Sequence, residues 1–267
     1  MKNMDNETIG KAVGDLLSLV RRLRAPNGCP WDAKQNNHTL KIYLIEEAYE
    51  VLDAIENGTS EEICGELGDL LFQIIFLAIL AEEKGEFDFA QVVKRITAKM
   101  IHRHPHVFSD TKVTSADQVA VNWARIKRAE ANGSELVSAS LKTIPSGLPA
   151  LLRAHRLSER AAKIGFDWTE RKEIWKKVLE EVEELRDAVE GDDEQAVTEE
   201  MGDLLFSLVN LSRHWGMNAE DLLRSANRKF LNRFERTEKH LNQSGISLEK
   251  ATIKQMNGAW EAVKRQA

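Results

Sequence analysis

The chain has 267 residues, of which 42% are hydrophobic and 30% charged, and its formal net charge is −6 at pH 7. This composition is typical of a globular protein with one large domain or two of ordinary size. The negative charge argues against a nucleic-acid-binding protein, which needs a basic face, but a bound cation would still allow a small anionic substrate.

Nothing in the chain suggests export or membrane insertion. Residues 1–13 have no apolar core of the signal-peptide type. The longest apolar run, residues 70–81, is interrupted by Gln73 and is too short to cross a bilayer. Cys29 and Cys64 have no metal-binding or redox spacing. We therefore expect a cytoplasmic protein without membrane contact.

Apolar residues recur at intervals of three and four along most of the chain, which predicts amphipathic helices and an all-α fold. In the first half we expect helices over residues 6–24, 38–57, 60–84, 88–103 and 115–131. In the second half we expect them over residues 147–163, 171–190, 193–215, 219–242 and 250–266. Residues 132–146 are predicted to link two helical-bundle domains, 1–132 and 146–267.

The two halves repeat one another. The matching blocks are residues 46–50 and 180–184, 53–56 and 187–190, and 66–72 and 200–206. All three blocks are related by the same shift in numbering (46 to 180, 53 to 187, 66 to 200), which indicates a duplication. The helix after Asp69 is apolar on nearly every side and has to be covered all round. We therefore expect the copies to pack together or the chain to form a homodimer.

Four acids in each half are placed to share helix faces. Residues three apart project side by side, so Glu47 pairs with Glu50, and Glu66 pairs with Asp69 on the next helix. If the two helices are antiparallel neighbours, the four carboxylates converge. The second half repeats the arrangement with Glu181, Glu184, Glu200 and Asp203.

Converging carboxylates repel one another unless a cation lies between them. Oxygen ligands without sulfur or clustered imidazole favour Mg²⁺, with Mn²⁺ as the alternative. Acidic residues also decorate solvated helix faces, and that interpretation suits any single pair taken alone. It suits the whole set less well, because Glu66, Asp69 and their counterparts lead directly into very apolar helices.

The acidic pattern resembles the signature of the MazG family of all-α nucleoside triphosphate pyrophosphohydrolases. Glu-Glu-x-x-Glu at 46–50 is followed, after fifteen residues, by Glu-x-x-Asp at 66–69, and segments 28–32 and 102–108 are also similar to that family. The resemblance covers almost the whole chain. It implies four-helix cores that dimerise, Mg²⁺ at the acids, and hydrolysis of ribo- and deoxyribonucleoside triphosphates to monophosphate and pyrophosphate. A broad base specificity and a housekeeping role in the nucleotide pool would follow.

A triphosphate needs cations for its charge and a flat group for its base. Helical spacing groups Lys229 with Arg233 and Trp260 with Lys264, and the first half has Lys99 with Arg103 and Trp123 with Lys127. On composition alone, a Lys/Arg pair on a helix is usually a solvated face, and a tryptophan is usually a core residue. Their repetition and their match to nucleotide-contacting positions of the family make them predicted substrate-binding residues, together with Lys177 and Glu199. The family often has a lysine where this chain has Ala196.

For the reaction we predict that Glu181, Glu184, Glu200 and Asp203 bind Mg²⁺, with Glu180 or Glu199 as the base for the attacking water. Both halves carry complete acid sets, Glu47, Glu50, Glu66 and Asp69 forming the first. The resemblance favours the C-terminal copy as the working one.

Three other interpretations are weaker. The histidines at 102, 104 and 106 suggest zinc, but Pro105 breaks their helix and no cysteine accompanies them. A di-iron helical bundle would use Glu-x-x-His, which does not occur. The N-terminal copy is also consistent with a nucleotide sensor or scaffold that binds without hydrolysis.

Overall fold

The structure is a computed structural model that describes residues 5–109, 111–130 and 137–265. Over these residues the chain forms helices and no strand. It divides into two compact units, residues 1–133 (unit 1) and 134–267 (unit 2). The prediction of an all-α fold is confirmed.

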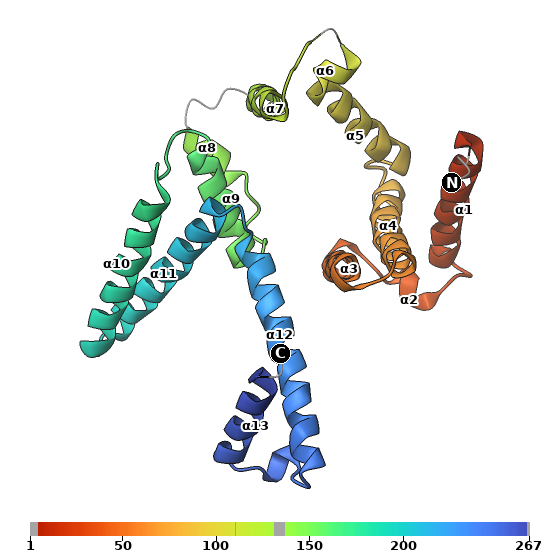
Figure 1. The fold of residues 1–267 in the computed structure, drawn as a ribbon. Helices are drawn as coiled ribbons and strands as arrows, with labels where there is room; N and C mark the ends of the chain where they lie inside the picture. The colour runs from red at the N-terminus through yellow and green to blue at the C-terminus, as the bar shows by residue number, and fades with distance from the viewer. Residues whose placement is uncertain (1–4, 110, 131–136, 266–267) are drawn as a thin grey trace. The chain divides into compact units, whose positions relative to one another are not determined.

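Unit 1 is built around a hairpin of two long helices. Its elements are α1 (Asn6–Arg24), α2 (Pro30–Ala33), α3 (Asn37–Asn57), α4 (Ser60–Glu83), α5 (Phe89–Arg103), α6 (Pro105–Phe108) and α7 (Ala116–Glu130). Helices α3 and α4 pack against each other, and α1 packs against α4 (Figure 1). The hairpin carries the acids of the first copy.

Local chemistry sets where these two helices begin. The Asn36 side chain accepts hydrogen bonds from the backbone N–H groups of His38 and Thr39, which caps α3. At the start of α4, Thr59 and Glu62 cap each other reciprocally. Between the helices, a Cβ on Gly58 would lie 2.8 Å from the carbonyl oxygen of Ala54, so only glycine allows this tight connection. The register of the acids along the hairpin follows from these caps.

The core of unit 1 lies on the second half of α4. Ile75, Phe76, Ile79 and Leu80 are buried there against Val20 of α1 and Leu40 of α3. Phe72 and Phe76 meet edge to face, with ring centroids 5.7 Å apart. The acids Glu66 and Asp69 occupy the first half of the same helix, so the acidic site borders this core.

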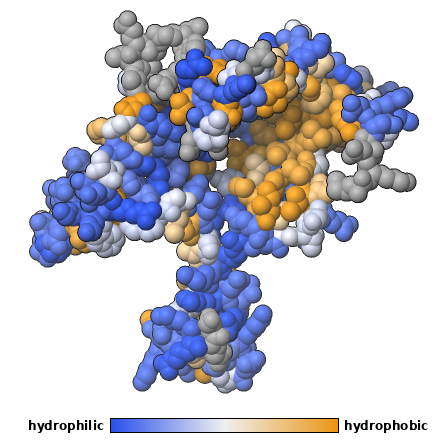
Figure 2. All heavy atoms as spheres, turned by 45° about the horizontal axis from the view of Figure 1, so that its top comes forward, coloured by the Kyte–Doolittle hydropathy of each residue, from blue (hydrophilic) through white to orange (hydrophobic). Residues whose placement is uncertain are grey.

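Large apolar side chains of unit 1 also stay exposed along the hairpin. They include Ile42, Ile45, Leu52, Ile55, Leu67 and Ile74. Figure 2 shows hydrophobic atoms gathered on the right-hand part of the view. Although residues 70–81 alone are too short to cross a bilayer, α4 as a whole has the length and composition of a membrane span, with 33% of its apolar window buried. The core helix of a soluble protein has the same properties.

Unit 2 contains a second hairpin. Its elements are α8 (Val137–Lys142), α9 (Ala150–Ala162), α10 (Arg171–Glu190), α11 (Glu194–His214), α12 (Ala219–Gln243), the 3₁₀ turn η1 (Leu248–Lys250) and α13 (Ile253–Arg265). Helices α10 and α11 pack together as α3 and α4 do, and α9 packs against α11. Ile174, Val178 and Val209 are buried between them. Helices α3 and α10 begin at equivalent positions of the sequence repeat, 37 and 171, so the duplication extends to the start of the hairpin.

All ten predicted helices occur, with ends that differ from the expected ones by up to three residues. The structure adds four short elements that the periodicity does not reveal: α2, α6, α8 and η1. Pro105 separates α5 from α6 and so ends the longer helix as expected. Helix α8 lies inside the segment expected to be a linker, and residues 132–136 of that segment lie outside the described residues.

Candidate metal and nucleotide site

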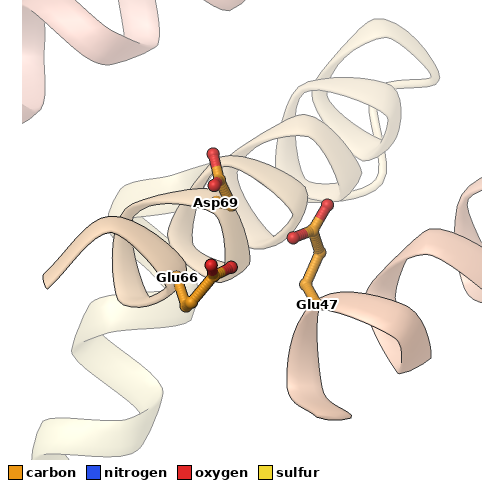
Figure 3. Close-up of side chains that lie close together, drawn as sticks. All are labelled: Glu47, Glu66 and Asp69. Carbon is orange, nitrogen blue, oxygen red and sulfur yellow. The ribbon is translucent and has the colours of Figure 1, made fainter. Parts of the chain in front are cut away.

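In unit 1, three acids from two helices converge. Glu47 projects from α3, and Glu66 and Asp69 project from the neighbouring turn of α4 (Figure 3). One carboxylate oxygen from each lies within 4.8 Å of the others. Glu50, the fourth predicted acid, is close enough to Glu47 to raise the pKa of that carboxyl by repulsion. Three of the four acids predicted to converge in unit 1 therefore lie together, with Glu50 as an electrostatic neighbour.

Glu47 and Glu66 are the partly buried members of this cluster, and Glu47 has the more strongly perturbed surroundings. Burial raises the pKa of Glu47, a hydrogen bond from Gln73 opposes that rise, and repulsion from Glu50 and Asp69 adds to it. Gln73 Nε2 donates to Glu47 Oε1 over 3.2 Å, and the amide oxygen of this buried Gln73 has no hydrogen-bond partner among the described residues. In the sequence, Gln73 stands out only as an interruption of an apolar run. Its polarity inside the otherwise apolar residues 70–81 is the signal in the sequence for a role beside the acids.

In unit 2, the corresponding cluster is formed by Glu181 and Glu184 of α10 with Glu200 of α11. One carboxylate oxygen from each again lies within 4.8 Å of the others. Burial raises the pKa of Glu200, and repulsion from Glu184, Glu181 and Asp203 raises it further. Glu181 is only 4% exposed. Asp203 is thus an electrostatic neighbour of the cluster, although its oxygens are not within the 4.8 Å group.

The two clusters together cover all four predicted positions. The unit 1 cluster includes Asp69, which corresponds to Asp203. The unit 2 cluster includes Glu184, which corresponds to Glu50. Every donor atom in both clusters is a carboxylate oxygen. Such a donor set fits a hard divalent cation and does not fit the zinc or di-iron interpretations, which need sulfur or imidazole. The repulsion at Glu47 and Glu200 is what such a cation would relieve.

Lys177 lies directly beside the acids of unit 2. Its Nζ is 2.7 Å from a carboxylate oxygen of Glu180 and 2.7 Å from one of Glu181. The hydrogen bonds to these two carboxylates hold the pKa of Lys177 well above its usual range. Lys177, which is predicted to contact a phosphate, is therefore already paired with two acids of the site.

The predicted bases flank the cluster. Glu180 is exposed and paired with Lys177, and Glu199 Oε1 accepts a hydrogen bond from Gln195 Nε2 over 3.4 Å. Repulsion from Glu199 contributes to the raised pKa of Glu200, so Glu199 lies within electrostatic reach of the cluster. Both carboxylates are accessible to water.

The predicted phosphate- and base-binding residues lie on other helices. Lys229 and Arg233 are on α12, and Trp260 and Lys264 are on α13, where Trp260 packs against Phe230 with ring centroids 5.4 Å apart. Helix α13 lies beside α12 and away from the α10–α11 hairpin (Figure 1). A single chain therefore places these four residues on two helices that pack together but does not bring Trp260 and Lys264 to the acids.

The matching residues of unit 1 have local partners. Arg103 forms an ion pair with Glu130, and the ring of His104 lies 5.8 Å from that of Trp123. Lys99 is exposed on α5, and the side chain of Lys127 lies outside the described residues. In the part of the chain that the structure describes, no histidine belongs to a group able to hold a metal, so His102, His104 and His106 form no such site.

A charged network joins the loop between α9 and α10 to the end of α11. Arg213 Nη1 donates to Asp167 Oδ2 over 2.9 Å, and His214 Nε2 lies 3.0 Å from Asp167 Oδ1. The hydrogen bonds from Arg213 lower the pKa of Asp167, and those from His214 add to the effect despite partial burial. This network holds the loop that leads into α10 against the end of α11.

Asp167→Asn is expected to lower the free energy of unfolding of unit 2 by about 1–3 kcal/mol near neutral pH, because a charged hydrogen-bond network loses its anion. The pKa of Asp167 is lower in the folded than in the unfolded state. Its contribution is therefore full above the unfolded pKa of about 3.9 and is lost as the pH falls through the folded value. Urea unfolding at a series of pH values measures both effects.

Asp187→Asn is the matched control, since Asp187 forms only an exposed pair with Arg186. It should change stability by less than about 0.5 kcal/mol. Equal losses in the two variants would contradict the role given to Asp167.

Comparisons with known proteins agree with the repeat and its register. The family model described as the MazG nucleotide pyrophosphohydrolase domain matches the chain twice, over residues 35–108 and 169–237. The nucleoside triphosphate pyrophosphohydrolase of Escherichia coli K12 is 43% identical over 94% of this chain and 96% of its own length. The protein from Thermotoga maritima called nucleoside triphosphate pyrophosphohydrolase/pyrophosphatase MazG is 40% identical over 94% of each chain. A solved MazG-related protein from Thermotoga maritima is 26% identical over 43% of this chain and 98% of its own, with a TM-score of 0.38.

Proposed function

Because the chain belongs to the MazG family of nucleotide pyrophosphohydrolases, we propose that it hydrolyses nucleoside triphosphates to nucleoside monophosphate and pyrophosphate at the acids of unit 2. The observation that carries this proposal is the convergence of Glu181, Glu184 and Glu200 within 4.8 Å, from two helices, inside a family match. We expect broad base specificity, ribo- and deoxyribonucleotides alike, and a cytoplasmic housekeeping role without nucleic-acid or membrane partners.

The residues that would hold the cation are Glu181, Glu184, Glu200 and Asp203. Their all-carboxylate chemistry favours Mg²⁺, with Mn²⁺ as a substitute. When bound, Mg²⁺ neutralises phosphate oxygens and polarises a water molecule. The buried Glu181 anchors this set in α10, while Glu200 and Asp203 present the facing turn of α11.

The chain's own groups do the remaining work. Glu180 or Glu199 accepts the proton of the water that attacks the α-phosphorus. The bond between that phosphorus and the α,β-bridging oxygen breaks, and pyrophosphate leaves with this oxygen. Lys177, Lys229, Arg233 and Lys264 offer positive charge to the phosphate oxygens, which stabilises the charge that builds up on the leaving group. Trp260 stacks on the base.

The assignment requires a homodimer, because one chain keeps Trp260 and Lys264 away from the acids. Apolar side chains of unit 2 are exposed along α11 and α12, among them Leu205, Leu208, Leu223, Phe230 and Leu231. Burying such a surface against a second copy would stabilise the dimer. It would also allow α12 and α13 of one copy to approach the acids of the other. Light scattering on the purified chain measures the oligomeric state.

Trp260→Ala is expected to raise KM about tenfold while leaving kcat nearly unchanged, because base stacking is worth about 1–3 kcal/mol and is lost equally in ground and transition states. The rise should appear for purine and pyrimidine triphosphates, since stacking does not read base identity. Steady-state kinetics of pyrophosphate release measures both constants.

Trp215→Ala provides the control, because Trp215 is also a tryptophan of unit 2 but lies at the end of α11 under the Arg171 guanidinium, where it is more exposed than Trp260. Its KM should stay within about twofold of the parent value. A KM for Trp260→Ala that equals the parent value would remove Trp260 from the substrate site.

The proposed function is tested by a screen of all eight common ribo- and deoxyribonucleoside triphosphates with Mg²⁺, with pyrophosphate and orthophosphate measured separately. We expect pyrophosphate from most substrates and no orthophosphate. Binding without any product would instead favour a nucleotide sensor, and orthophosphate release would indicate attack at the γ-phosphorus.

A further inference from the structure

The two copies keep their acids but differ in the groups that touch them. In the register of the repeat, Lys177 of unit 2 corresponds to Tyr43 of unit 1, and Ser207 corresponds to Gln73. Lys177 contacts Glu181 by an ion pair, whereas Gln73 contacts Glu47 by a neutral hydrogen bond. One acid cluster therefore has a built-in cation and the other does not.

In unit 2 the ammonium group of Lys177 is paired with Glu181, one of the acids proposed to bind the metal ion. Lys177 Nζ lies 2.7 Å from Glu181, whose side chain is 5% exposed, while the lysine side chain is 34% exposed. A buried carboxylate requires a counter-charge, and Lys177 supplies it from the solvent side. Lys177 pairs with Oε1 of Glu181, so it competes with a divalent ion for this carboxylate.

In unit 1 nothing comparable has to be displaced. Tyr43 packs against the apolar core cluster. Over the described residues, Glu47, Glu66 and Asp69 form no ion pair. A cation approaching this cluster meets three carboxylates and the Gln73 amide.

We propose that Lys177 is an internal counter-ion that makes metal binding and triphosphate binding depend on each other in unit 2. This inference rests on the proposed function. A triphosphate gives the flexible Lys177 side chain a new anionic partner, so the ammonium leaves Glu181 as the phosphate arrives. The metal then binds a carboxylate that has become free. Linkage requires the reverse effect too, so bound metal strengthens nucleotide binding by the same factor.

The test measures Mn²⁺ binding to the full chain by electron paramagnetic resonance of free Mn²⁺. Glu47→Gln, Glu50→Gln, Glu66→Gln and Asp69→Asn together remove the unit 1 acids, so that unit 2 is observed alone. Binding is measured with and without a triphosphate analogue whose α,β-bridging oxygen is a methylene group. The Mn²⁺–analogue complex is measured separately without protein and subtracted.

In this background Lys177→Met is expected to strengthen Mn²⁺ binding without nucleotide by about three- to tenfold, the effect of removing a partly exposed competing ion pair. The further strengthening caused by the analogue should shrink by a similar factor. Lys177→Arg, which keeps the ion pair, should retain the parent coupling. Lys176→Met removes the same charge from the preceding residue of α10 and should change neither quantity.

Unchanged coupling in Lys177→Met, or an equal effect of Lys176→Met, would overturn the inference. Thermal unfolding followed by circular dichroism verifies that each variant is folded. The proposed function fails separately: it is refuted if unit 2 releases no pyrophosphate from a hydrolysable triphosphate in the background without unit 1 acids, whether or not it retains Mn²⁺. If Lys177→Met releases pyrophosphate normally and keeps the parent coupling between Mn²⁺ and analogue binding, only the role given to Lys177 is refuted.

Discussion

Glu200→Ala is expected to lower the turnover number for pyrophosphate release by about a thousandfold, and Asp203→Ala by a similar factor. Each substitution removes a carboxylate from the set proposed to hold the metal, and several kcal/mol of charge stabilisation at the reacting phosphate depend on that ion. Glu200 is half-buried on α11 and Asp203 is exposed one turn later, so neither supports the core. Stopped assays of pyrophosphate release measure the loss.

Circular dichroism should show unchanged helix content in both variants. The matched controls are Glu66→Ala and Asp69→Ala, which make the same changes on α4 of unit 1. If unit 2 performs the reaction, the controls keep most of the parent turnover. A double variant of Glu200 and Asp203 that retained full activity would refute the assignment of the site.

Removing divalent metal with a chelator is expected to reduce turnover to background, and adding Mg²⁺ should restore it. Without a cation, Glu181, Glu184 and Glu200 repel both one another and the incoming triphosphate. Helix content should persist, because Ile174, Val178 and Val209 hold the hairpin together through apolar packing. Assays with excess chelator, then with Mg²⁺ or Mn²⁺ in excess of it, measure both steps.

Turnover that persists in the chelator would contradict a metal-dependent reaction. A loss of helix content on chelation would show instead that the ion is structural. Restoration by Mn²⁺ as well as Mg²⁺ is expected from oxygen ligands alone, since neither cluster offers sulfur or imidazole.

The long helices were predictable because each repeats apolar residues with the helical period over several turns. Helix α10, predicted and found over residues 171–190, is the clearest case. The short helices were not predictable, because a single turn such as Pro30–Ala33 contains no period. That turn depends on contacts such as the hydrogen bond from the Cys29 N–H to the Leu23 carbonyl, which no local pattern shows. Helix α8 was hidden in a segment with a turn-like composition.

The acid clusters were predictable in kind, because spacing places Glu47 with Glu50 and Glu66 with Asp69 on single helix faces. Which three of the four acids approach most closely depends on rotamers and on the exact contact between the helices. The third member of the close group is Asp69 in unit 1 but Glu184 in unit 2. The position of Trp260 was not predictable either. Periodicity identifies its face on α13 but does not show how far α12 carries that helix from the acids.

The different neighbours of the two clusters were visible in the sequence but needed the repeat to interpret them. Aligning the halves in the register of their acidic blocks places Lys177 opposite Tyr43 and Gln73 opposite Ser207. Only the structure shows that Lys177 and Gln73 reach the acids themselves.

The central claim, that paired helices of unit 2 present a metal-bound triphosphate to water, is tested most directly by two matched full-length proteins. One carries amides in place of Glu47, Glu50, Glu66 and Asp69, and the other carries amides in place of Glu181, Glu184, Glu200 and Asp203. With Mg²⁺, the first should release pyrophosphate at close to the parent rate and the second at background. Parent-level release by the second protein would contradict the account.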